Sequence, residues 1–98
     1  MPGPIQRNHV VKYFGTPDEA EGSVNEPRER EEHGLQFNEK WTYHNPRHDP
    51  AGAAERVIYW HRYDYVGSMV RPTGAGDWRV DDKLPSALHA AEHPAPSA

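Results

Sequence analysis

The stretch Arg56–Val66 constrains the fold most, because an extended chain here carries bulky side chains on both faces. One face holds Val57, Tyr59, His61, Tyr63 and Tyr65, and the other holds Ile58, Trp60, Arg62, Asp64 and Val66. Alternation with a period of two predicts a β-strand. Gly67, directly after it, predicts a bulge or a bend. A strand of this kind needs cover on both sides, and the rest of the sequence must supply it.

Apolar side chains are scarce in the rest of the chain. Of the 98 residues, 35% are hydrophobic, ten of those are alanine, and 15 of the 24 larger apolar or aromatic side chains lie within residues 35–80. So few large side chains cannot offset the ordering cost of the whole chain, which is about 1–2 kcal/mol per residue for the backbone. We therefore expect either that part of the chain stays mobile or that a partner covers the apolar surface.

The fold class predicted from these patterns is mainly β, with a small antiparallel sheet of three or four strands. We expect the strands near residues 9–14, 35–44, 56–70 and 77–80. Three segments follow from the composition: residues 1–34 as an arm, a short strand and an acidic loop, residues 35–82 as the β-module, and residues 83–98 as a weak helix and a disordered tail. Leu84 and Leu88 have the spacing of a helix.

The charge distribution limits the classes of partner. Formal net charge is −4, and seven carboxylates fall within residues 16–34, which predicts a mobile loop there. A negative chain is a poor match for nucleic acid or an anionic membrane, so neither is an expected partner. No apolar run is long enough for a membrane span or a secretory signal, so the cytoplasm is the expected compartment. The acidic segment also gives a hypothesis of its own, in which residues 18–32 mimic a nucleic-acid backbone and so inhibit a basic protein.

Aromatic residues and arginine point to an interface on the sheet. If one face of Arg56–Val66 covers the core, the other exposes rings, and Tyr, Trp and Arg are enriched at binding hot spots. The leading prediction is a non-catalytic accessory or protein-interaction module that docks onto a larger protein or onto a second copy of itself. Its predicted contact residues are Trp41, Tyr59, Trp60, Arg62 and Tyr63. The alternative is an aromatic core with loops folded over both faces.

Seven histidines give a second hypothesis, a small metal-binding protein or a metal-dependent enzyme. Neutral imidazoles with one carboxylate suit zinc or iron. The predicted ligands surround the loop between the two longest strands: His44, His48 and His61, with Asp64 or Asp49 as the carboxylate. Whether His44 and His61 share a sheet face depends on the strand register, which the sequence leaves open.

Overall fold

Residues 5–46, 49, 51–72 and 76–92 are described in this computed structural model, and they form two helices and seven strands. The protein is mainly β, as the sequence predicts. The elements follow in the order α1 (Arg7–Phe14), β1 (Glu19–Gly22), β2 (Arg30–Glu32), β3 (Leu35–Phe37), β4 (Glu39–His44), β5 (Glu55–His61), β6 (Asp64–Arg71), β7 (Arg79–Val80) and α2 (Leu84–Glu92).

Five strands form one antiparallel sheet in the order β1-β4-β5-β6-β7, and β2 pairs with β3 in a separate hairpin. The antiparallel architecture is confirmed, although β1 raises the number of strands above the predicted four. The single strand predicted over Arg56–Val66 is wrong. The chain turns back at Arg62 and Tyr63, so that His61 pairs with Asp64 and the two halves become β5 and β6. A two-residue hairpin loop usually contains Gly or Asn, which accept a positive φ easily. This turn has neither residue, and Arg62 adopts the positive φ, at +58°.

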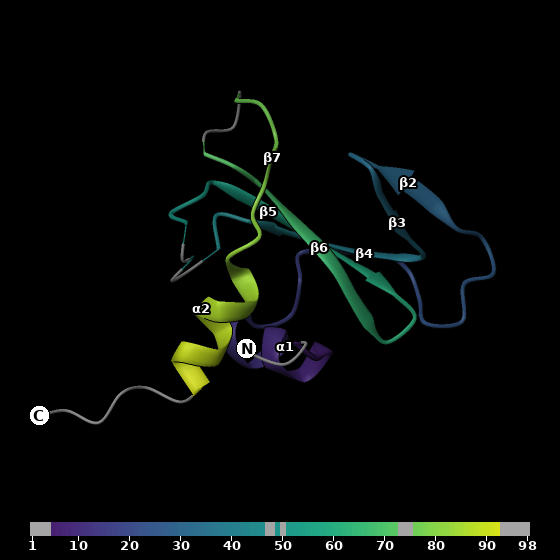
Figure 1. Ribbon diagram of the computed structural model, residues 1–98, viewed down its shortest axis with the longest axis horizontal. Helices are drawn as coiled ribbons and strands as arrows, with labels where there is room; N and C mark the ends of the chain where they lie inside the picture. Colours follow the sequence, from purple (N-terminus) through teal and green to yellow (C-terminus); the bar gives the residue numbers. More distant parts are fainter. Residues whose placement is uncertain (1–4, 47–48, 50, 73–75, 93–98) are drawn as a thin grey trace, which may run out of the picture.

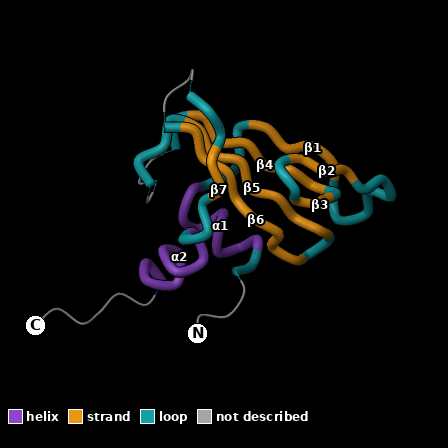
Figure 2. Tube along the Cα trace, turned by 45° about the horizontal axis from the view of Figure 1, so that its top comes forward, coloured by secondary structure: helices purple, strands orange, loops and turns teal. Residues whose placement is uncertain are grey.

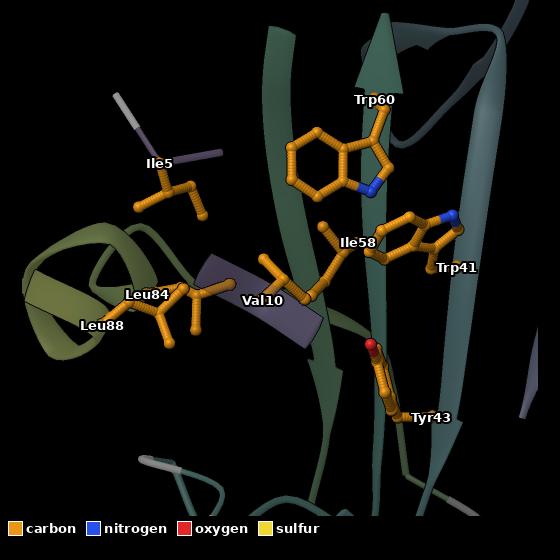
Figure 3. Close-up of a cluster of buried hydrophobic side chains, with 8 residues drawn as sticks. All are labelled: Ile5, Val10, Trp41, Tyr43, Ile58, Trp60, Leu84 and Leu88. Atoms are coloured by element: carbon orange, nitrogen blue, oxygen red, sulfur yellow. The ribbon is translucent and has the colours of Figure 1, made fainter. Parts of the chain in front are cut away.

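Both faces of the sheet are covered, as Figure 1 shows, with α1 and α2 on one side and the β2–β3 hairpin on the other. Alternation along β5 divides its side chains between two clusters. The helix-side cluster contains Ile5, Val10, Trp41, Tyr43, Ile58, Trp60, Leu84 and Leu88, which Figure 3 shows facing one another. The hairpin-side cluster contains Phe37, Val57, Tyr59 and Met69. Residues from all three predicted segments thus build the core.

The strand predicted over residues 9–14 is wrong, because this segment lies within helix α1. Branched and aromatic residues favour a strand in so short a run, but packing decides between the two structures. Val10 is fully buried, and Tyr13 and Phe14 pack against the same cluster, as the spacing of a helix requires. Gly15, with a φ of +87°, ends the helix.

The acidic segment is ordered where β1 and β2 form, which corrects the prediction of a mobile loop over residues 16–34. Backbone pairing, rather than apolar burial, holds these strands. Glu21 of β1 pairs with Lys40 of β4, and β2 is joined to β3 by a turn at His33 and Gly34, whose φ values are both positive as in a type I′ turn. Gly22 lies so close to the backbone of Asn38 that a Cβ here would come within 2.1 Å of its carbonyl oxygen.

The strand predicted over residues 35–44 is interrupted at Asn38, which separates β3 from β4. The predicted C-terminal helix is confirmed as α2, with Leu84 and Leu88 buried on the helix-side cluster. In Figure 2 the two helices lie together on one side of the strands. The disordered tail predicted over residues 94–98 lies outside the described residues. Neither of the two described helices has the length and apolar character needed to cross a lipid bilayer.

Candidate interaction surface at the hairpin tip

Three of the five predicted contact residues are buried. Trp41, Tyr59 and Trp60 expose 5%, 1% and 0% of their surface. The prediction that one face of the sheet exposes its aromatic rings is therefore wrong. The reason is that α1, where a strand is predicted, covers one face, and the β2–β3 hairpin, of which only β2 lies in the predicted loop, covers the other.

Arg62 and Tyr63, the other two predicted contact residues, lie on the surface. They form the turn between β5 and β6, which we call the hairpin tip (residues 61–64). Tyr63 exposes 71% of its surface, more than either of the other exposed large hydrophobic residues of the described chain, Val11 and Val80. Arg62 adopts the left-handed backbone region, which costs an L-residue of this size free energy and is tolerated where the surroundings hold it in place.

The surroundings of the hairpin tip hold it from one side. The backbone N–H of Arg62 donates to the Oδ1 atom of Asn38 at 2.8 Å, and its guanidinium donates to the backbone oxygen of Val24 at 3.2 Å. His61 adds a contact between its Nε2 atom and Glu29 Oε1 at 2.5 Å. Asn38 is itself buried, so its position is fixed. The turn is therefore anchored, while the ring of Tyr63 stays in solvent.

A hollow lies beside the tip, between the start of α1 and the start of β6. Its lining mixes apolar, amide, phenol and charged groups from Ile5, Gln6, Arg7, Asn8, Tyr63, Asp64 and Tyr65. The charge of the Arg7 guanidinium is neutralised within the protein. The guanidinium makes a bidentate ion pair with Glu39 and lies 4.7 Å from the centre of the Trp41 ring. Such a surface suits a partner's side chain of mixed polarity.

The predicted metal site does not form. His44 pairs with Glu55 at one end of β5, and His61 lies at the other end, six residues further along the strand, or about 20 Å. Asp64 lies beside His61 alone, and His48 is outside the described residues. Within the described ranges no group of three His, Asp or Glu side chains is arranged to hold a metal ion. The prediction that His44 and His61 bind one zinc or iron ion is wrong, because the register separates them.

The carboxylates of the acidic segment are largely matched by cations or histidines. Five contacts of this kind involve residues 19–32: Glu19 with His44, Glu21 with Arg30, Glu26 with Arg28, Glu29 with His61, and Glu32 with Lys40. Local pairing of this kind weakens the negative field that a mimic of a nucleic-acid backbone needs. The geometry therefore gives that reading no support.

Sequence reasoning missed a cluster of buried charges around Arg56. Its guanidinium, fully buried, donates to Asp49 Oδ1 at 2.6 Å, to Asp81 Oδ2 at 2.9 Å and to Ser68 Oγ at 2.7 Å. Asp49 also accepts the backbone N–H groups of Ala51 and Ala53. The available signal was an arginine in the middle of a strongly apolar strand, because a buried charge requires partners. The cluster joins the loop before β5 to the segment before α2.

The Arg56 cluster predicts how stability changes in acid. Burial alone would raise the pKa of Asp49, but the hydrogen bonds from Arg56, Ala53 and Ala51 outweigh it and hold that pKa below its ordinary value. A carboxyl with a lowered pKa in the folded state contributes stability above its unfolded pKa of about 3.9, and this contribution is lost as pH falls through the folded value. We expect the free energy of unfolding, measured with urea from pH 7 to 2, to fall on this account.

The exposed residue Asp77 supplies the control for the loss of stability in acid. Asp77→Asn should leave the pH dependence unchanged, whereas Asp49→Asn should lower stability at pH 7 and flatten the slope in acid. A full acid slope in Asp49→Asn would assign the effect to other carboxylates.

Comparison with protein-family models, with curated proteins and with solved structures found no match.

Proposed function

We propose that this protein is a non-catalytic interaction module that docks onto a larger protein, or onto a second copy of itself, through the hairpin tip. The supporting observation is the 71% exposure of Tyr63 on a turn that is otherwise anchored. Of the ten Phe, Tyr and Trp rings, five are buried and four are half-buried, so the single exposed ring, next to a residue with positive φ, stands out. Arg62 and Tyr63 are the proposed contact residues, as the sequence suggested, and the neighbouring hollow receives a side chain of the partner.

Anchoring of the tip favours tight association. A partner that contacts a flexible loop must order it, at about 0.5–1.5 kcal/mol for each immobilised side chain. Here the hydrogen bond from Arg62 to Asn38 already fixes the backbone. Tyrosine itself loses few torsions on binding, which is one reason why it is enriched at hot spots.

Tyr63→Ala separates binding from folding. Because Tyr63 is exposed and outside both core clusters, we expect the free energy of unfolding to change by less than about 0.5 kcal/mol. Loss of a hot-spot ring costs about 2 kcal/mol or more, a weakening of at least roughly 30-fold. The measurement is the mass of the native complex by size-exclusion chromatography with light scattering, alongside urea unfolding of the purified variant.

A photo-crosslinking amino acid locates the contact. Placed at position 63 it should join the chain to its partner, and placed at position 80 it should not, because Val80 is similarly exposed, at 62%, but lies on β7. Equal crosslinking from the two positions, or a complex of unchanged mass in Tyr63→Ala, would remove the hairpin tip from the interface.

A further inference from the structure

His44, the last residue of β4, lies between carboxylates from both neighbouring strands. Its Nε2 atom is 2.6 Å from Glu19 Oε2 of β1, and its Nδ1 atom is 2.9 Å from Glu55 Oε2 of β5. Two more charged groups complete the surroundings. Arg71 of β6 forms an ion pair with Glu55, and the carboxylate of Asp18 accepts the backbone N–H of His44 at 2.7 Å.

The number of N–H groups on the ring decides how many of these contacts are favourable. A neutral imidazole carries one N–H, whereas an imidazolium carries two, and an ionised carboxylate can only accept. Both ring nitrogens of His44 lie at hydrogen-bond distance from a carboxylate oxygen, so both contacts are favourable only when the ring is protonated. The two carboxylates lie at opposite nitrogens of the ring, so they cannot converge on one metal ion bound there.

Of the two strands whose carboxylates contact the His44 ring, β1 is the one at an edge of the sheet. It has four residues, all exposed, and it pairs with β4 at the edge of the sheet. Glu55 keeps Arg71 as a partner whatever the state of the ring, while Glu19 is 64% exposed and free to turn into solvent. A neutral ring would present a lone pair to one of the two carboxylates, and Glu19 is the more exposed of them.

We propose that protonated His44 holds β1 on the sheet, and that β1 loosens as pH rises and the ring becomes neutral. Histidine is the side chain whose charge ordinarily changes between about pH 5 and 8. The stabilising contact is present on the acid side of that change and is lost on the alkaline side. Release of β1 uncovers the backbone of β4, and an uncovered strand edge can pair with another extended chain.

Amide hydrogen exchange in the full chain, followed by NMR from pH 5 to 8, tests the proposal. After correction for the intrinsic rise of exchange with pH, we expect protection in β1 to fall by roughly two- to fivefold as the His44 ring titrates, the size typical of exposed ion pairs. Protection in β5 and β6 should not follow that titration. Unchanged protection in β1 across the titration of the His44 ring would overturn the proposal.

Two substitutions and one matched control complete the test. His44→Gln cannot titrate, and Glu19→Gln removes the carboxylate from β1, so each should abolish the pH response of β1. His61→Gln is the control. His61 contacts a single carboxylate, that of Glu29, and a neutral His61 ring can still donate one N–H to it. Its β1 response should equal that of the parent chain. A response that persists in Glu19→Gln would show that the contact between His44 and Glu19 does not hold β1.

Discussion

Replacing Arg56 with methionine is expected to cost about 3–5 kcal/mol, a large share of the roughly 5–15 kcal/mol by which native proteins are stable. The methionine fills the space of the aliphatic part of the side chain, but Asp49 and Asp81 then lose the cation that compensates their burial. Their side chains expose 2% and 10% of their surface, so water cannot replace it. Urea unfolding followed by circular dichroism measures the loss.

Two further variants show that the loss comes from unpaired charge. Arg79→Met makes the same chemical change on the exposed strand β7 and should cost less than about 0.5 kcal/mol. Adding Asp49→Asn and Asp81→Asn to Arg56→Met removes the buried charges altogether and should recover part of the stability. If Arg56→Met costs less than 1 kcal/mol, the cluster does not stabilise the fold as described.

Trp60→Ala is expected to destabilise the protein by about 3–5 kcal/mol, because it opens a cavity at the centre of the helix-side cluster. The Trp60 ring is fully buried, and its centre lies 5.1 Å from that of Trp41 and 6.0 Å from that of Tyr65. This outcome is the reverse of the behaviour of a surface contact, for which binding would suffer more than folding. Thermal and urea unfolding of the purified variant measure it.

Trp60→Phe supplies the graded control. The Nε1 atom of Trp60 has no hydrogen-bond partner in the described structure, so phenylalanine removes volume without breaking a hydrogen bond. We expect it to cost less than half as much as Trp60→Ala. A folded Trp60→Ala protein that has lost less than 1 kcal/mol would place the ring outside the core.

The local pattern of the sequence predicts the class of fold well. Alternating large side chains in residues 56–61 and 69–70 belong to real strands, and the bulge expected at Gly67 is found where Tyr59 pairs with Gly67 but Trp60 pairs with Tyr65. The turn at Arg62 could not be predicted from the types of its residues. Its positive φ is supported by the hydrogen bond to Asn38, 24 residues away. No local rule contains such a contact.

The candidate site could be predicted only in part, for the same reason. Arg62 and Tyr63 were singled out from their residue types, but which rings stay outside depends on what covers the sheet. That cover comes from α1, whose residues favour a strand, and from a hairpin rich in glutamate, in which Leu35 and Phe37 reach the sheet. The pairing of His44 with Glu19 and Glu55 likewise needs the strand register.

The helix-side cluster also has a consequence for how the chain folds. It joins Ile5, just before α1, and Val10 of α1 to Leu84 and Leu88 of α2, so residues 74 to 83 positions apart close over the same rings. Closing so long a loop is entropically costly before the contact rewards it, which slows folding. Since neither helix can bury its apolar side without the other parts in place, we expect the molecule to assemble and come apart in a single cooperative step.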